Sequence, residues 1–97
     1  EMKQICDTVG ADYSDVVKLA LYDKRVGDSH WQVPGPDGYS GFGGKCFPKD
    51  LNALIHFCLT NGFEPVILKA AWKKNMQVRE EHDWLNIEGA VTKGVKK

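Results

Sequence analysis

Apolar residues recur every three or four positions along most of the chain, a spacing that predicts helices. The first stripe consists of Met2, Ile5, Cys6 and Val9. Gly10 follows it as a typical helix stop. A second helix is expected to begin near Asp12, with Asp15 in its first turn, where the helix dipole favours a negative charge. Its predicted buried face consists of Val16, Val17, Ala20 and Leu21.

Two further helices are predicted to begin at prolines, since proline is well tolerated at the first helical position. The third helix should start at Pro48 and close at Asn61-Gly62. Its apolar positions are Leu51, Leu54, Ile55 and Cys58. The fourth should start at Pro65 and fade near Glu80-Glu81. Its apolar positions are Ile67, Leu68, Ala71, Trp72 and Met76.

No segment alternates apolar and polar residues for long enough to predict a strand, so the expected fold class is all-α with about four helices. The tail from Asp83 is short and mixed, and its Trp84, Leu85 and Ile87 are expected to pack on another part of the protein, with a further domain as one candidate. Because the chain opens inside a helical pattern at Glu1, we also expect it to be part of a longer protein.

A long loop between the second and third predicted helices has a different composition. Six glycines and two prolines fall between Gly27 and Gly44, which leaves no room for a regular element. The run from Pro34 to Gly38 predicts consecutive turns. Long ordered loops within small domains are usually functional, so the candidate chemistry lies here.

Charge and cysteine content exclude several classes of function. Thirteen basic residues balance 13 acidic ones, which argues against a general binder of nucleic acid or anionic membranes. No apolar run approaches the roughly 20 residues of a membrane-spanning helix. Three cysteines without a C-x-x-C pair argue against a disulfide framework and a metal site, and they fit a reducing, cytoplasmic compartment.

The most informative segment is GFGGKCFPKD, from Gly41 to Asp50. Its glycines let backbone amides approach a ligand closely, and the loop runs into a helix N-terminus, where negative charge is favoured. Cys46 lies just before the first predicted turn, so its thiolate form should be favoured. Asp50, four residues later, could position water for a second step if the helix extends back to the cysteine. This pattern indicates a covalent intermediate on sulfur that is then hydrolysed.

Other interpretations remain open from these residues alone. A cysteine near a helix start is often an inert small residue, and the glycines are explained by turn formation. A non-catalytic helical dimerisation module and a thiol redox sensor are therefore alternatives to an enzyme.

The segment Gly41 to Asp50 resembles the catalytic-cysteine signature of the UDP-glucose 6-dehydrogenase family, a group of nucleotide-sugar dehydrogenases. The segments Asp23 to Gly27 and Gly10 to Asp12 are similar to the family's D-x-R-[IV]-G and G-A-D motifs, in the same order. The resemblance runs from Glu1 to about Arg79. It implies a central helical domain, residues 1–82, that forms a homodimer core between an NAD-binding and a nucleotide-binding domain. Residues 83–97 would then be a linker toward the latter domain.

This resemblance implies an NAD-dependent, two-step oxidation of the primary alcohol of UDP-glucose to the acid, through an aldehyde and a cysteine thioester. Cys46 would be the nucleophile, and Asp50 would assist the water that hydrolyses the thioester. The substrate would contact Gly41, Phe42, Gly43 and Arg25, the last often from a neighbouring subunit. The residues that border the nicotinamide would be Cys46, Phe47, Pro48 and Lys49. A sibling enzyme for GDP-mannose or a UDP-N-acetylhexosamine would share the motif and stays an alternative.

The chain departs from the family pattern in two respects. The loop stretch from Trp31 to Tyr39 is longer than in some members. The family's lysine and asparagine on the preceding helix, and its dinucleotide-binding fingerprint, would lie before Glu1. The chain by itself is therefore expected to be inactive.

Overall fold

The computed structural model describes residues 1–87, and every regular element among them is helical. The expected all-α class is therefore confirmed for the described part of the chain. The chain forms two compact units, which divide between Val33 and Pro34. Residues 88–97, which include most of the predicted linker, lie outside the described residues.

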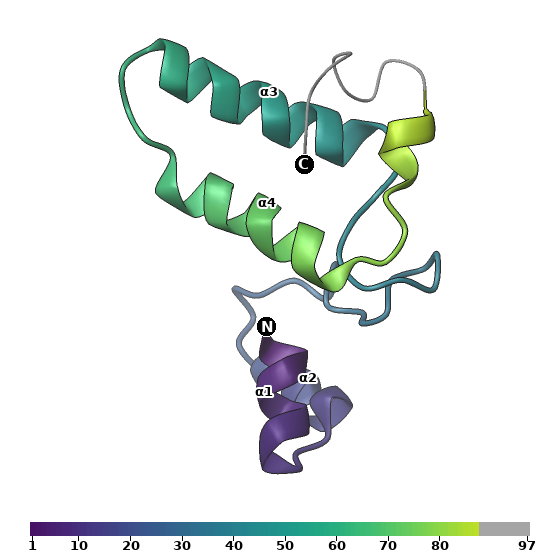
Figure 1. Ribbon diagram of the computed structural model, residues 1–97. Coiled ribbons are helices and arrows are strands. Elements are labelled where there is room, and N and C mark those ends of the chain that lie inside the picture. The colour runs from purple at the N-terminus through teal and green to yellow at the C-terminus, as the bar shows by residue number, and fades with distance from the viewer. Residues whose placement is uncertain (88–97) are drawn as a thin grey trace. The chain divides into compact units, whose positions relative to one another are not determined.

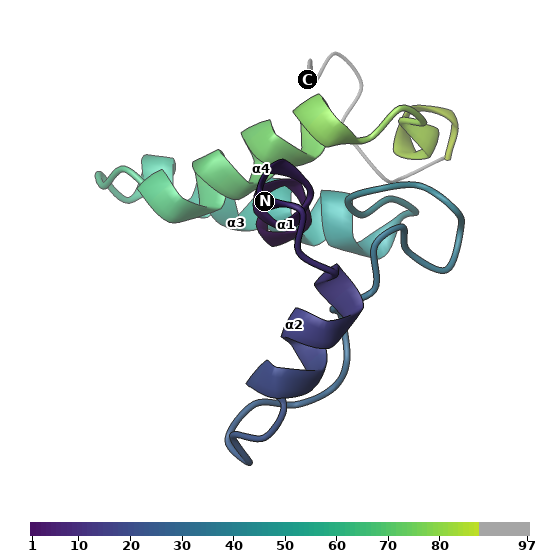
Figure 2. The same cartoon turned by 90° about the horizontal axis from the view of Figure 1, so that it is seen from below.

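The first unit contains α1 (Met2–Val9) and α2 (Tyr13–Ala20), which contact each other. Figure 2 shows α1 end-on and α2 from the side. Gly10 ends α1 in the left-handed conformation, with φ of 76°, which glycine adopts without the steric cost of a Cβ. Asp12 caps α2, and its side chain accepts the N–H of Asp15 at 3.1 Å. Both predicted helix boundaries are confirmed here.

The predicted buried face of α2 is wrong, because no residue of this helix is buried. Val16 is exposed, whereas Val17 and Ala20 are only half-buried. An apolar stripe identifies the face that can be covered, but burial also needs an element packed against it. Cys6 of α1 is the buried apolar residue of this unit.

The loop after α2 is held to the first unit by a tryptophan. The Trp31 indole N–H donates to the carbonyl of Gly27 at 2.8 Å, and the Tyr13 hydroxyl donates to the carbonyl of Trp31 at 2.6 Å. Trp31 therefore anchors the loop.

The second unit is built on α3 (Cys46–Thr60) and α4 (Val66–Val78), which run side by side in opposite directions (Figure 1). The short helix η1 (Asp83–Asn86) follows them. Gly62, with φ of 86°, helps to turn the chain after α3, as Asn61-Gly62 predicts. The turn predicted from Pro34 is also present, since the N–H of Gly38 donates to the carbonyl of Gly35 at 2.9 Å.

Two predictions for these helices need correction. The third helix begins at Cys46, two residues before the predicted Pro48. Proline is tolerated there because the first four N–H groups of a helix have no partner within the helix. The fourth helix ends at Val78, slightly before the expected Glu80.

The core of the second unit is centred on Trp84, which is 1% exposed, and on Cys58 and Pro48. The Trp84 ring lies 5.2 Å from the Trp72 ring of α4. Trp84 is therefore packed, as expected, and its partner lies within this chain and not in a further domain. Ile67, expected on the apolar face of α4, is 83% exposed. Among residues 1–87, no helix has the length and apolar character needed to cross a membrane.

Candidate active site

Cys46 is the first residue of α3, and it is exposed, whereas Cys6 and Cys58 are buried. The thiol therefore lies at the N-terminal end of α3 and is accessible from solvent. Lys45, the residue before the helix, makes no side-chain cap to these N–H groups.

Asp50 lies one helical turn after Cys46, so the two residues share a face of α3. The two side chains can be neighbours only if the helix extends back to the cysteine, and α3 does begin there. The Asp50 side chain is 68% exposed and forms an ion pair with Lys49 at 3.3 Å. An exposed pair of this kind contributes little to stability, so the carboxylate remains available to water.

The loop before α3 is fixed by a buried asparagine. The Asn75 side chain accepts the N–H of Phe42 at 2.7 Å and donates to the carbonyl of the same residue at 2.9 Å. Asn75 is 2% exposed, so both bonds are largely shielded from water. Gly41, with φ of 74°, lies so close to the Asn75 side chain that a Cβ there would collide with it.

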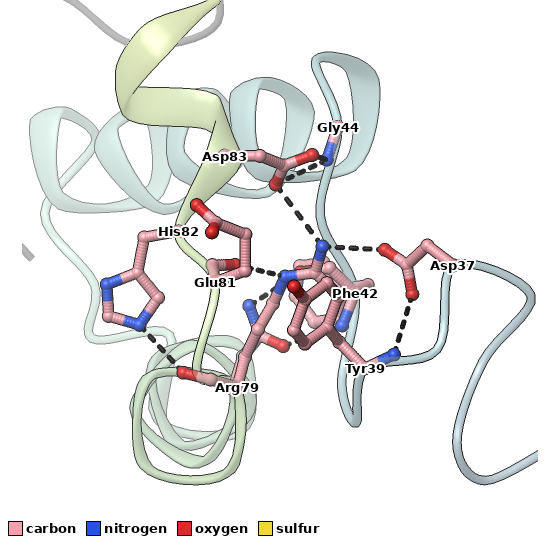
Figure 3. A network of polar contacts seen from close by, with 9 residues as sticks. Asp37, Tyr39, Phe42, Gly44, Arg79, Glu81, His82 and Asp83 are labelled. Carbon is pink, nitrogen blue, oxygen red and sulfur yellow. Dashed lines mark hydrogen bonds and ion pairs between the residues drawn. The ribbon is translucent and has the colours of Figure 1, made fainter.

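A second contact holds the next part of the loop. Both carboxylate oxygens of Asp83 accept the N–H of Gly44, each at 3.1 Å. A Cβ on Gly43 would collide with the Arg79 guanidinium and with the Asp83 carboxylate. Figure 3 shows these groups converging on the loop from the segment that follows α4. Asn75, Arg79 and Asp83 are called the loop clamp below.

Arg79 is the centre of this arrangement and is 3% exposed. Its Nη2 donates to Asp37 at 2.7 Å and to Asp83 at 3.3 Å, and its Nε donates to the carbonyl of Glu81 at 2.6 Å. The guanidinium also lies over the Tyr39 ring, 5.4 Å from its centroid. Its Nη1 has no hydrogen-bond partner among the described residues.

These contacts favour the charged forms of the ion pair. Burial alone would lower the pKa of Arg79, but the hydrogen bond with Asp37 and the charges of Asp37 and Asp83 outweigh it and raise that pKa. The guanidinium, followed by the N–H of Tyr39, holds the pKa of the Asp37 carboxyl below its usual value.

Aromatic rings connect the surface near Cys46 to the core. Phe47 packs edge-on against Phe42 with 5.5 Å between centroids, and Phe42 lies 6.1 Å from Trp72, which in turn contacts Trp84. Phe47 and Lys49 are exposed, whereas Pro48 between them is buried.

The predicted substrate residues fall into two groups. Gly41, Phe42 and Gly43 lie in the clamped loop that leads to Cys46. Arg25 belongs to the first unit, where its exposed side chain pairs with Asp23 at 2.8 Å. The hydrogen bonds from the Arg25 side chain and backbone hold the pKa of Asp23 below its usual value.

The loop clamp was missed by the sequence analysis. The sequence does contain a signal for it. One face of the fourth helix carries Leu68, Trp72, Asn75 and Arg79, so two polar residues interrupt an otherwise apolar stripe. A buried polar residue requires a partner, so such an interruption indicates a specific hydrogen-bonding role. Nothing in the local sequence of Asp83 indicates its bond to Gly44.

Comparison with known proteins is consistent with this geometry. Residues 1–77 match the UDP-glucose/GDP-mannose dehydrogenase family, central domain. The chain is 38% identical over 80 residues to the UDP-glucose 6-dehydrogenase of Pseudomonas aeruginosa, covering 82% of this chain and 17% of that protein. It is 35% identical over 94 residues to UDP-glucose 6-dehydrogenase YwqF of Bacillus subtilis, covering 95% and 20%. The Rickettsia bellii UDP-glucose 6-dehydrogenase is 38% identical over 77 residues, covering 79% and 17%.

The chain thus spans a fifth or less of the length of these relatives. No solved structure matches it. The family match covers most of the chain, and it includes the glycine loop, Cys46 and Asp50. The chain therefore belongs to the UDP-glucose/GDP-mannose dehydrogenase family and carries its central domain.

Proposed function

We propose that this chain is the central domain of a longer, NAD-dependent UDP-glucose 6-dehydrogenase, which oxidises UDP-glucose to UDP-glucuronate through a thioester on Cys46. The observation that carries the proposal is the exposed thiol at the first position of α3. It directly follows a glycine loop that is fixed by the hydrogen bond from Gly44 to Asp83. The names of the relatives support the choice of UDP-glucose.

In this mechanism Cys46 acts on the aldehyde formed by the first oxidation. Its sulfur bonds to the carbonyl carbon as the S–H bond breaks, and the thiol proton passes to the carbonyl oxygen to give a thiohemiacetal. The second oxidation removes a hydride from this carbon and the hydroxyl proton, which leaves the thioester. The exposed position of Cys46 at the start of α3 leaves its sulfur accessible to the aldehyde.

Asp50 acts in the last step, the hydrolysis of the thioester. Its carboxylate takes a proton from water as the water oxygen attacks the thioester carbon, and the Cys46 thiolate leaves with the bonding electrons. The exposure of Asp50 and its place on the same helix face as Cys46 suit this role. A carboxylate next to a thiol would be a poor activator of the thiol itself, since like charges oppose thiolate formation.

Substrate contacts are assigned to the loop and to Arg25. Backbone groups of Gly41, Phe42 and Gly43 would lie along the sugar, where the small side chains permit close approach. Arg25 would reach the substrate from a neighbouring subunit, which requires a homodimer. Exposed apolar side chains on α1, among them Ile5 and Val9, and on α4, among them Ile67, are suited to such association.

NAD supplies the hydride acceptor when it is bound. Cys46, Phe47 and Lys49 offer exposed surface and fit a position at the border of the nicotinamide. Pro48 is fully buried, so it would shape this border from beneath and make no side-chain contact. Most of the dinucleotide would be held by a domain outside this chain, and for that reason the chain alone is expected to be inactive. A reducing compartment, the cytoplasm, suits the free thiol.

The test uses the full-length protein with NAD and either UDP-glucose or GDP-mannose. Wild type should reduce NAD with UDP-glucose, Cys46→Ala should abolish formation of the acid, and Asp50→Asn should slow hydrolysis so that a covalent adduct accumulates on Cys46 by mass spectrometry. Asp15→Asn, at an exposed carboxylate of α2, is the matched control and should behave as wild type. Full activity of Cys46→Ala would overturn the nucleophile. Turnover of GDP-mannose alone would place the protein with the family's other substrate.

A further inference from the structure

The glycine loop before Cys46 is held by side chains that the mechanism above does not use. Asp83 occupies the N–H of Gly44, and Asn75 occupies both backbone groups of Phe42. We propose that Asp83, braced by Arg79, is a positioning residue that sets the place of the Cys46 thiol. The proposal rests on the proposed function of Cys46.

A loop of this composition needs an external support. Gly41 and Gly44 have φ of 74° and 80°, and glycine backbone can leave these values easily because no Cβ restricts it. Catalysis by a nucleophile depends on its location, and a displacement of about 1 Å can cost on the order of a hundredfold in rate. The glycines allow the loop many conformations, so contacts with other segments must fix its position.

Asp83 is suited to supply that contact because it is fixed on its other side. Its Oδ1 accepts from Arg79 Nη2 at 3.3 Å, while both of its oxygens accept from Gly44. Trp84, the next residue, is 1% exposed and ties the backbone of η1 into the core. The carboxylate is thus connected to the most buried part of the unit.

Arg79 in turn is restrained by Asp37, by the carbonyl of Glu81 and by the Tyr39 ring. Because the guanidinium is nearly inaccessible to water, withdrawal from either carboxylate would leave a buried charge poorly compensated. A Cβ on Gly43 would collide with the guanidinium, so Arg79 fills the space beside this part of the loop. Both Arg79 and Asp83 lie after residue 77, where the family match ends.

The experiment compares Asp83→Ala and Asp83→Asn with the control Glu80→Ala, an exposed residue of the same segment. Kinetics are measured on the full-length protein well below its unfolding temperature. Hydrogen exchange is measured by mass spectrometry on peptides that cover residues 41–45. Asp83→Ala should lower kcat by about 10- to 100-fold, with the KM for UDP-glucose changed by less than about threefold, and should accelerate exchange in the loop. Asp83→Asn should recover much of kcat, since its amide oxygen still accepts an N–H.

Wild-type kcat and unchanged loop exchange in Asp83→Ala would overturn the proposal, as would a change in KM without a change in kcat. If the alanine variant fails to fold, Asp83→Asn decides by the same measurements: it should show a smaller loss of kcat and faster exchange in residues 41–45, and wild-type values for both would overturn the proposal. If the wild-type protein shows no dehydrogenase activity, the proposed function fails, whereas faster loop exchange in the Asp83 variants would still establish the restraint on the loop.

Discussion

Asp83 accepts the backbone N–H of Gly44 with both carboxylate oxygens, although 39 positions separate the two residues. The bond joins the end of the glycine loop to the segment that follows α4. It makes residues after the family match part of the environment of Cys46.

A methyl group on Gly43 should be costly. Gly43→Ala would place a Cβ against Arg79 and Asp83, and overpacking of this kind costs about 1–3 kcal/mol. We expect a lower midpoint of thermal unfolding of the full-length protein, measured by circular dichroism. Gly27→Ala is the matched control, because nothing lies within 4 Å of a Cβ there. Equal midpoints for the two variants would contradict the contact.

Removal of the Asn75 side chain should leave two backbone groups of Phe42 without partners. Because the Asn75 side chain that pairs with them is buried, Asn75→Ala should lower the free energy of unfolding by about 1–3 kcal/mol. The exposed Gln77 on the same helix provides the control. Gln77→Ala should change the free energy of unfolding by less than about 0.5 kcal/mol. Denaturant unfolding monitored by tryptophan fluorescence gives both values, and a neutral Asn75→Ala would argue against the paired bonds.

Stability should depend on pH through Asp37. Its pKa in the folded protein lies below the ordinary 3.8, so the unfolded chain binds this proton more readily. The stabilisation by its pair with Arg79 is therefore complete above that value and is lost as pH falls through the lowered pKa.

The measurement is the difference in unfolding midpoint between wild type and Asp37→Asn, which should be largest near neutral pH and should shrink between about pH 5 and pH 3. Asp28→Asn, at an exposed carboxylate of the first unit, controls for general effects of charge. If the difference in unfolding midpoint stays constant down to pH 3, the ion pair between Asp37 and Arg79 is not the cause of that difference.

The three cysteines should differ sharply in reactivity. Cys46 is exposed at a helix N-terminus, whereas Cys6 and Cys58 are buried, so iodoacetamide should modify Cys46 at least about tenfold faster under native conditions. Peptide mapping by mass spectrometry identifies the labelled residue, and the denatured protein shows that all three can react. Similar native rates for Cys46 and Cys58 would rule out the difference in access.

The sequence by itself determined the helices and the candidate nucleophile. Helix periodicity, the Asp12 cap and the Gly10 and Gly62 turns are local features, and each reflects contacts within a few residues. The motif from Gly41 to Asp50 is contiguous, so it identified Cys46 and Asp50 without knowledge of the fold.

Tertiary structure decided which faces are buried and what holds the loop. Val16 and Ile67 are apolar yet exposed, because an amphipathic stripe does not reveal whether another element covers it. Trp84 packs within this chain, and Asp83 reaches Gly44, because folding brings distant segments together. Local sequence carries no information about such pairings. The geometry around the thiol therefore depends on side chains that only the folded chain could identify.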